Sequence, residues 1–419
     1  MRRIMAGSRR TRLLGASVIV TLTVLVGLSG NAATAPTQAQ RQTVDTIRLG
    51  TLPIANALPL DLGIQKGFFA AQQIEIKKTI LQSGNDIVLG MGGKSFDIGY
   101  VGYVPAMIAR TTGIPLTIIA ASEVEGTSDA DNWQNIIVKG SSSIRTPADL
   151  AGKTVAVNAL KGVGEVVIKA ALKKQGVDPN SVKLLALPFP AMRSALGNGQ
   201  VDAIWTPEPF LTQALTIDGA RTVLAPGPVL GNYFPNGGYV ALTDWTRRNP
   251  GVAKRLTAAI NESLTYARGH PDEIRALLPA ASRNVRLPVW SPLIDRVQLL
   301  QLAKYAKEFN VISTLPNMTQ LAPSSIRSGT GTGTIEVTVD DTIAVKQAGA
   351  AVKHLDPGRY LVIVKDDSSS LNFHLIGPGV NRKTGVAARG TIRWNVTLKA
   401  GTYRYSSDQG SVQGSFRVS

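Results

Sequence analysis

The sequence predicts an α/β protein made of two similar lobes, followed by a small all-β domain. The first observation is an internal repeat, because residues 92–100 (GGKSFDIGY) are echoed by residues 197–205 (GNGQVDAIW). The second is that the same order of apolar strands and helical stretches precedes each copy. The third is a change after Pro316, where helical patterns give way to short strands separated by Gly, Pro and Asp turns.

Each half of the repeat has the pattern of a β-α-β-α-β unit. Apolar strands are expected at 47–52 and 154–157, second strands at 74–80 and 182–187, and third strands directly after the two glycine turns. Parallel strands need helical crossovers, so each unit predicts one parallel α/β lobe. Two such lobes leave a cleft at the carboxyl ends of their strands, where small molecules bind in open α/β sheets.

The pattern also predicts how the chain is divided. Lobe one is expected over about 45–134 and 238–320, and lobe two over about 139–235. Residues 135–138 (NIIV) are interpreted as the first crossing between the lobes, and 238–242 as a return strand, which makes the hinge double. Two amphipathic helices, from Pro250 and over 292–309, are expected on the outside of a lobe. Residues 321–334 are predicted to be a flexible linker and 335–419 the β domain.

Composition excludes several functions. The net charge is +17, from 45 basic and 28 acidic residues. The basic residues are scattered rather than clustered among aromatic side chains, so we expect no nucleic-acid partner. The sequence has no cysteine, which excludes disulfides, thiolate metal sites and cysteine nucleophiles.

The N-terminus predicts export to the periplasm or cell surface. A basic segment containing Arg9 and Arg10 precedes the apolar run 13–28 and a region of small residues, which is the order of a secretory signal. Residues 1–39 are therefore expected to be a signal peptide, or alternatively an uncleaved N-terminal anchor. We expect contact with a membrane only through such an anchor or through a membrane partner.

Residues 45–320 resemble the extracytoplasmic solute-binding proteins of ABC importers, of the nitrate, sulfonate, taurine and thiamine-precursor family. The resemblance rests on the segments 47–50 (IRLG), 66–69 (KGFF), 96–99 (FDIG), 147–153 (PADLAGK), 201–205 (VDAIW) and 208–210 (EPF). It implies a two-lobed periplasmic-binding-protein fold of type II with a double hinge, which closes on a small-molecule ligand and docks on an ABC permease. A pyrimidine-synthesis enzyme on the same fold would require a cysteine-rich motif, so we expect a non-enzyme without a cofactor.

The last part of the chain resembles a cupredoxin-type β-sandwich. The resemblance lies in 371–379 (LNFHLIGPG), 401–405 (GTYRY) and 414–418 (GSFRV). Leu371 stands where copper-binding members place a histidine, and Ser406 or Ser407 where they place a cysteine. Gln409, Gly410 and Val412 occupy the rest of the site loop, so His374 alone remains. One imidazole does not make a copper site, and we expect a domain without copper.

Ligand contacts are expected from loops that follow strands and from the starts of the next helices, where unpaired amides and positive potential suit an anion. The candidates are Asn56, Ala57, Ser83, Gly84, Asn85, Tyr100, Gly102, Asn158, Trp205, Glu208, Asn232 and Tyr233. Ser83, Gly84 and Asn85 also fit an ordinary turn with a helix cap. Tyr100 and Trp205 occupy the same position in the repeat, which favours the cleft over the core for both.

The sequence leaves open the role of an aspartate pair, the role of Glu208 and the identity of the ligand. Asp97 and Asp202 resemble a carboxylate pair for acid-base chemistry, but their equivalent places in the repeat favour a structural role at the start of a strand. Glu208 leaves a cationic pyrimidine possible as the ligand. The favoured function is a receptor for a small organic anion such as a sulfonate, taurine or nitrate. The alternatives are a receptor for a thiamine-precursor pyrimidine or another small organic solute, and a related enzyme or sensor.

Overall fold

The computed structural model describes residues 44–324, 326, 333–347, 350–355, 358–386, 388–409 and 412–418. The signal or anchor segment expected over 1–39 lies outside these residues. Within the described part of the chain, no helix is both long enough and apolar enough to cross a membrane.

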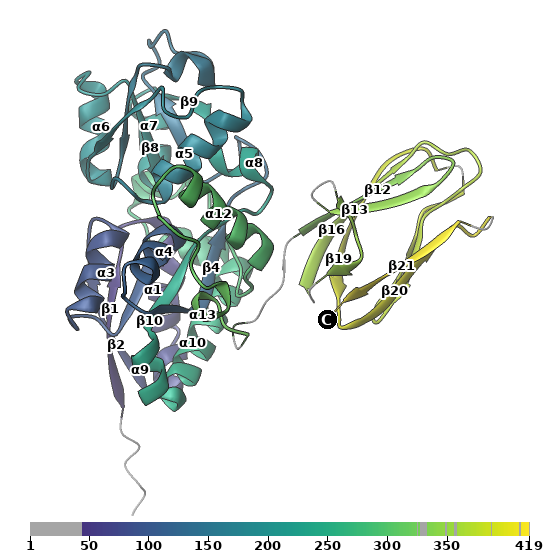
Figure 1. The fold of residues 1–419 in the computed structure, drawn as a ribbon, viewed down its shortest axis with the longest axis horizontal. Helices are drawn as coiled ribbons and strands as arrows, with labels where there is room; N and C mark the ends of the chain where they lie inside the picture. Colours follow the sequence, from purple (N-terminus) through teal and green to yellow (C-terminus); the bar gives the residue numbers. More distant parts are fainter. Residues whose placement is uncertain are drawn as a thin grey trace, which may run out of the picture. The chain divides into compact units, whose positions relative to one another are not determined.

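The first lobe is built on a six-stranded sheet in the order β11-β4-β10-β3-β1-β2. Figure 1 labels its strands β1, β2, β4 and β10. Its strands are β1 (Asp45–Thr51), β2 (Ile74–Ile80), β3 (Ile98–Gly102), β4 (Leu116–Val124), β10 (Pro235–Leu242) and β11 (Val289–Trp290). β1 runs parallel to β2 and β3, as the repeat predicts. β10 returns from the second lobe and pairs antiparallel with both β3 and β4, so it is the second crossing of the hinge.

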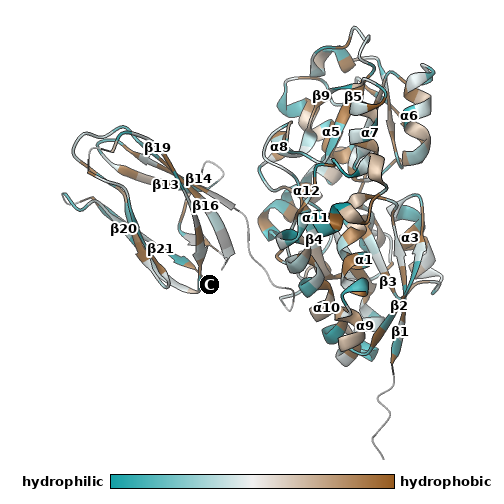
Figure 2. Cartoon of the chain, turned by 180° about the vertical axis from the view of Figure 1, so that it is seen from behind, coloured by the Kyte–Doolittle hydropathy of each residue, from teal (hydrophilic) through white to brown (hydrophobic). Residues whose placement is uncertain are grey.

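Helices flank this sheet. They are η1 (Ala55–Ala57), α1 (Leu58–Gln65), α2 (Phe68–Ala71), α3 (Gly84–Gly92), α4 (Tyr103–Thr111), α9 (Thr243–Arg248), α10 (Pro250–Gly269), α11 (Pro271–Ala276), η3 (Ala280–Ser282), α12 (Arg296–Glu308) and α13 (Met318–Leu321). α10 begins at Pro250, as predicted, because a first-turn residue needs no amide hydrogen. Leu256, Ile260 and Leu264 recur at helical spacing and are buried against the lobe, whereas polar residues cover the outer sides of the helices (Figure 2).

The second lobe has a five-stranded sheet in the order β7-β6-β8-β5-β9. Its elements are β5 (Gln134–Val138), η2 (Pro147–Leu150), β6 (Thr154–Val157), α5 (Val163–Lys174), β7 (Lys183–Ala186), α6 (Phe189–Gly197), β8 (Ala203–Pro207), α7 (Phe210–Thr216), β9 (Arg221–Leu224) and α8 (Pro226–Leu230). One expectation was wrong: β5 is not the crossing segment, because it pairs along its length with β8 and β9. The second sheet therefore begins at Gln134, and the crossing is the loop before it.

The aspartates of the two repeats, Asp97 and Asp202, hold the first strand of each repeat, β1 and β6. Asp97 accepts a hydrogen bond from the backbone N–H of Arg48 (3.0 Å) and pairs with the Arg48 guanidinium (2.8 Å). Asp202 accepts one from the backbone N–H of Thr154 (2.8 Å). The guanidinium of Arg48 lowers the pKa of Asp97 despite partial burial of the carboxyl group. The structural interpretation of the pair is confirmed, since each carboxylate ties the start of the third strand of its repeat to the first strand of that repeat.

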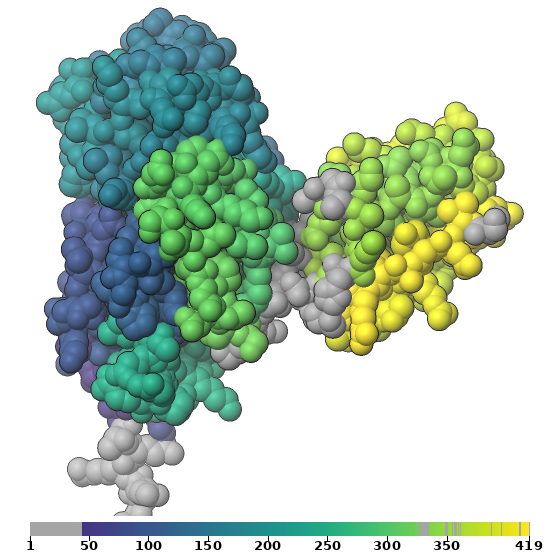
Figure 3. Space-filling view, in the orientation of Figure 1, coloured from purple at the N-terminus to yellow at the C-terminus, as the bar shows by residue number. Residues whose placement is uncertain are grey.

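α12 contacts both lobes rather than the outside of one. It packs against α4 in the first lobe and α5 in the second, and in Figure 3 this green segment covers the boundary between the two. Buried Leu299, Leu302 and Ala303 join a hydrophobic core that draws on both lobes. The expectation that this helix lies on one lobe was therefore wrong, because its apolar face is shared.

The start of the expected linker is also packed. Arg296 donates to the carbonyl oxygens of Ala322 and Pro323, the latter at 2.7 Å. Ile326 is buried in the same core as α12. The chain therefore remains attached to the lobes through Ile326, and the composition of 321–334 misplaces the beginning of the linker.

The C-terminal part has two five-stranded sheets, in the orders β14-β13-β12-β16-β19 and β15-β21-β20-β17-β18. The strands are β12 (Gly333–Val339), β13 (Ile343–Gln347), β14 (Ala350–Ala351), β15 (His354–Leu355), β16 (Gly358–Asp366), β17 (His374–Gly377), β18 (Val380–Lys383), β19 (Gly390–Leu398), β20 (Gly401–Ser406) and β21 (Gln413–Val418). Side chains from both sheets, such as Val337, Val362, Tyr403 and Phe416, share one hydrophobic core. Alternating burial along these strands explains why their period-two pattern is visible in the sequence.

Candidate functional site

A pocket lies where the two lobes meet. It encloses about 470 Å³ between the protein atoms, counting the part open to solvent. Its lining comes from both lobes and from the crossings: Leu52, Ile54, Gly84, Asn85, Gly102, Pro105, Trp133, Gln134, Asn158, Ala159, Gly162, Val163, Phe189, Trp205, Pro207 and Asn236. None of these described residues carries a formal charge, so polar recognition here depends on carboxamides, one free indole and backbone groups.

Three helices start at this pocket. α3 begins at Gly84, α4 follows Gly102 and α5 follows Gly162, and all three glycines line the pocket. Gly102 and Gly162 provide no side-chain cap, so first-turn N–H groups of α4 and α5 remain available. Helix N-termini carry partial positive charge, and glycine allows a ligand to approach the backbone closely. The arrangement therefore offers converging donors to an anion without any cationic side chain.

Hydrogen bonds already join the lobes across this cleft. Asn85 Nδ2 donates to the carbonyl oxygen of Leu160 (3.2 Å), and Asn158 Nδ2 donates to that of Gln82 (3.4 Å). Gly102 approaches α5 so closely that an added Cβ would lie 2.3 Å from Val163 Cγ2. The structure is thus a closed arrangement of the lobes, and its contacts involve pocket residues.

The expected ligand contacts divide into two groups. Gly84, Asn85, Gly102, Asn158 and Trp205 line the pocket. The sequence argument missed Trp133 and Asn236, which lie on the two crossings between the lobes, Gln134 at the start of β5, and Phe189 at the start of α6. A signal for the crossings was present, since a cleft between two lobes must also be bounded by the strands that connect them.

The remaining candidates lie elsewhere. Asn56 and Ala57 are buried in η1, and the Asn56 carbonyl accepts from Trp290 Nε1 (3.1 Å). Ser83 caps α3 by accepting from the backbone N–H of Asp86 (3.1 Å). Asn232 is exposed, and Tyr233 beside it has a left-handed backbone (φ 58°). None of these residues lines the pocket.

Tyr100 and Trp205 do not form a matched pair at the cleft. Trp205 lines the pocket, and Gly164 of α5 leaves room for its ring, because an added Cβ would lie 2.6 Å from Trp205 Cε3. Tyr100 instead packs against Tyr239 of the returning strand β10, with ring centroids 5.3 Å apart. The repeat position is the same, but the ring of Tyr239 packs beside Tyr100, and Tyr100 belongs to the core of the first lobe.

Glu208 is not a ligand contact in this arrangement. One carboxylate oxygen accepts from the backbone N–H of Thr212 (2.9 Å), and the other from Thr212 Oγ1 (2.7 Å) and the backbone N–H of Arg286 (3.1 Å). Its carbonyl also accepts from the backbone N–H of Ala55 in the first lobe (2.9 Å). Glu208 therefore braces the junction of the lobes, and its carboxylate is already satisfied.

Two carboxyl groups are buried beside the crossings. Glu123 lies on β4 and Glu125 directly follows that strand, and each is no more than 2% exposed. Burial raises the pKa of Glu123 to about 7 and that of Glu125 to about 8. The carboxamides of Gln134 and Asn236 donate to Glu125 Oε1, the latter at 2.9 Å. The Oε2 atoms of both glutamates have no partner among the described residues.

These two groups predict a pH dependence of stability. Each pKa is raised in the folded protein from an ordinary value of 4.5, so the unfolded chain ionises first as the pH rises. The contribution of these two groups to stability is therefore full below about pH 4.5, and it falls by a few kcal/mol as the pH rises through about 8. Urea unfolding across this range is expected to show a shallower decline for Glu125→Gln than for the parent. The exposed Glu262→Gln on α10 is the matched control, and equal slopes for all three proteins would contradict the prediction.

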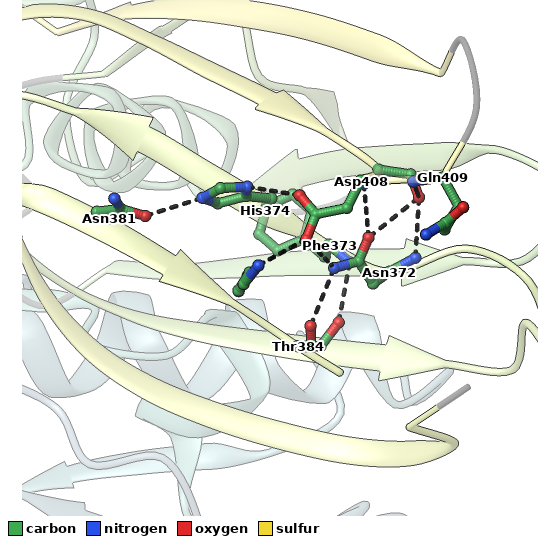
Figure 4. A network of polar contacts seen from close by, with 9 residues as sticks. Asn372, Phe373, His374, Asn381, Thr384, Asp408 and Gln409 are labelled. Carbon is green, nitrogen blue, oxygen red and sulfur yellow. Dashed lines mark hydrogen bonds and ion pairs between the residues drawn. The ribbon is translucent and has the colours of Figure 1, made fainter. Parts of the chain in front are cut away.

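A polar network occupies the end of the β domain where the cupredoxin resemblance would place a metal (Figure 4). His374 contacts Asp408 Oδ1 through Nδ1 and Asn381 Oδ1 through Nε2, both at 2.8 Å. Asp408 also pairs with Lys383 (2.9 Å) and accepts from Asn372 Nδ2 (3.2 Å). These partners lower the pKa of Asp408 to about 2. Both ring nitrogens of His374 are engaged within the domain; Gly410 of the expected site loop lies outside the described residues.

Comparison with known proteins extends these observations. The NMT1/THI5-like family model matches residues 55–274, just over half of the chain. The nitrate/nitrite binding protein NrtA of Nostoc sp. is 23% identical over 231 residues, 52% of this chain and 52% of that protein. The taurine-binding periplasmic protein of Escherichia coli is 29% identical over 195 residues, 45% of this chain and 57% of that protein. The chain thus spans between half and three fifths of these relatives' own length.

Solved structures share the arrangement of the lobes. The alkanesulfonate-binding protein SsuA of Xanthomonas axonopodis, bound to MOPS, has a TM-score of 0.56 at 20% identity, covering 68% of this chain and 99% of that one. The periplasmic nitrate-binding protein NrtA of Synechocystis has a TM-score of 0.55 at 15% identity, covering 68% and 87%. The two lobes therefore have the α/β fold of these binding proteins.

Proposed function

This chain belongs to the NMT1/THI5-like family, and on that premise we propose that it is an exported solute receptor that captures a small organic anion between its lobes. The observation that carries the proposal is the convergence of three glycine-led helix starts on a pocket without charged side chains. Neutral donors of this kind suit an anion that must later be released, because helix termini attract it without a permanent ion pair. The net charge of +17 falls to +12 without the five arginines of the expected signal segment 1–39, and it still adds a long-range attraction for anions.

The pocket lining supports a sulfonate-like ligand with an organic tail. Asn85 and Asn158 provide carboxamides, and the buried Nε1 of Trp205 has no partner among the described residues. Trp133, Phe189 and Pro207 provide apolar surface for a tail. Known relatives are named for nitrate, taurine and bicarbonate, and a similar structure for alkanesulfonates. A cationic pyrimidine loses its support, since the Glu208 carboxylate is engaged by Thr212 and Arg286.

Capture occurs by closure of the two lobes about the double crossing. Ligand contacts from α3 and α4 on one side and α5 on the other favour the closed state, because a ligand shifts an equilibrium by its differential affinity for the two states. The bonds from Asn85 to Leu160 and from Asn158 to Gln82 act in the same direction. The closed receptor then docks on the permease of an ABC importer, outside the membrane. Its relatives are named as binding proteins, which supports a role without catalysis.

A thermal-shift panel tests the receptor function. The chain is mixed in turn with nitrate, bicarbonate, taurine, ethanesulfonate, a larger aryl sulfonate and an aminopyrimidine. A ligand present at about 100 times its Kd stabilises the folded state by about 2.7 kcal/mol, so a tight ligand raises the melting temperature by several degrees. We expect sulfonates to give the largest shifts. Shifts from the pyrimidine alone, or turnover of any compound, would count against an anion receptor.

For the C-terminal domain we propose a cupredoxin-like sandwich that has lost its copper. The contacts of His374 with Asp408 and Asn381 support this interpretation, and no cluster of three metal-ligating side chains occurs in the described ranges. We expect that Cu(II) added to the protein produces no intense visible absorbance band. Variant His374→Ala serves as the control for adventitious binding, and a band that disappears in this variant would contradict the proposal.

A further inference from the structure

Glu125 lies directly beneath the ligand pocket, at the meeting point of both crossings. It follows β4 of the first lobe, and its Oε1 accepts from Gln134, the first residue of β5, and from Asn236 on β10 (2.9 Å). Gly227 of α8 closes the other side, because an added Cβ there would lie 2.2 Å from Glu125 Cγ. The side chain is 1% exposed, and Oε2 has no partner among the described residues. One carboxyl group is thus enclosed by segments that join the two lobes.

The two carboxamides held by Glu125 are themselves part of the pocket lining. A carboxamide has its nitrogen and oxygen on opposite branches, so a group whose NH₂ donates to Glu125 presents its oxygen elsewhere. In the part of the chain that the structure describes, the side-chain oxygens of Gln134 and Asn236 accept no hydrogen bond. With Glu125 ionised, both amides turn their NH₂ groups to the buried negative charge and their oxygens away from it, an arrangement that disfavours an anion in the pocket.

A neutral Glu125 reverses this arrangement. Its hydroxyl is a donor and needs an acceptor, which an amide oxygen of Gln134 or Asn236 can provide at this place. The amide that turns its oxygen toward Glu125 then presents its NH₂ to the pocket, as an anion requires. Burial raises the pKa of Glu125 to about 8, so both forms are accessible near neutral pH.

Few other titratable groups face Glu125. Glu123 lies two residues earlier on β4, and its charge further raises the pKa of Glu125. Tyr239 is on β10, and Asp131, in the loop before β5, is held by Thr127 and Ser128. β5 and α8 contribute no titratable side chain. Glu125 is therefore the carboxyl group in direct contact with pocket residues.

We propose that Glu125 is a positioning residue that sets the hydrogen-bonding polarity of the pocket, so that binding of an anion is coupled to uptake of one proton from solvent at Glu125. The inference rests on the proposed receptor function. It adds a condition for binding: the receptor binds anions when Glu125 is protonated and binds them weakly when Glu125 is ionised. Gln134 and Asn236 transmit the effect, and Glu125 itself does not touch the ligand.

The test is calorimetric titration of the full chain with ethanesulfonate and with nitrate, whose charges are constant from about pH 6 to about pH 9.5. We expect Kd to be nearly constant below about pH 7 and to rise about tenfold per pH unit above about pH 8, as linkage to one proton requires. Titrations in buffers of different ionisation enthalpy are expected to report close to one proton taken up per anion at about pH 9. Glu125→Gln, which is neutral at every pH, should abolish both effects, and the exposed Glu262→Gln should retain them.

The outcomes are distinguishable. A flat affinity across this range without proton uptake in the parent protein overturns the coupling but leaves the receptor function intact. Proton uptake that persists in Glu125→Gln assigns the effect to another group and also overturns the proposal. No binding of either anion at any pH removes the receptor function and this inference together. Because the parent titrations alone decide the coupling, the test stands even where the variant fails to fold.

Discussion

Substituting Gly102→Ala is expected to weaken ethanesulfonate binding by about 10- to 100-fold, corresponding to about 1–3 kcal/mol of overpacking. The added Cβ would lie 2.3 Å from Val163 Cγ2 across the cleft. Val163 is β-branched and on a helix, so its side chain has little freedom to move aside. Gly102 has an extended backbone (φ −63°, ψ 151°) that alanine also adopts. The change therefore opposes closure of the lobes without straining the first lobe.

A second substitution tests this reason. Val163→Ala removes the clashing methyl group, and the Cβ of residue 102 would then face Val163 Cβ at 3.5 Å, an ordinary contact. We expect the double variant to recover most of the lost affinity in calorimetry, and small-angle scattering to show a more open Gly102→Ala protein in the presence of ligand. Gly197→Ala is the matched control, because its added Cβ meets no atom within 4 Å. Unchanged affinity in Gly102→Ala would mean that the ligand-bound lobes do not meet in this geometry.

Replacing Trp205 is expected to have the largest combined effect. Trp205→Ala removes a ring that is 3% exposed and packs near Phe189, with centroids 6.2 Å apart. Loss of a buried aromatic side chain costs about 3–5 kcal/mol of unfolding free energy. Because the same ring lines the pocket, ethanesulfonate binding should fall below detection. Urea unfolding and calorimetric titration of one preparation measure both effects.

Trp205→Phe separates the packing role of the ring from its donor role. The buried Nε1 has no partner among the described residues, so removing it leaves no acceptor unsatisfied and should change stability little. A hydrogen bond to a charged group contributes about 1.5–3 kcal/mol, so the affinity for an anion should still fall by about 10- to 100-fold. Trp245→Phe on α9, remote from the pocket, is the control. Full affinity in Trp205→Phe would exclude the indole N–H as a ligand donor.

The elements of the lobes were predictable because their signals are local. Apolar strands and glycine turns repeat in one order, and Pro250 marks the first turn of a helix; parallel strands require helical crossovers. The role of Asp97 and Asp202 followed from the same repeat. The expectations that failed concern pairing across long distances: β5 joined the second sheet, α12 packed against both lobes, and the chain remained attached through Ile326. Hydropathy shows that a face is buried, but it does not show against which partner.

By itself, the sequence determined that two α/β lobes present helix starts with small residues, and it placed Gly84, Asn85, Gly102, Asn158 and Trp205 at the site. Only the tertiary structure decided that Tyr100 is core, that Glu208 braces the junction and that Trp133, Gln134 and Asn236 complete the pocket. The physical reason is that a helix start depends on neighbours in the chain, whereas a cleft depends on how separate sheets meet. The environment of Glu125 also depends on how the sheets meet, since Gln134 reaches it from β5 of the second lobe and Asn236 from the returning strand β10.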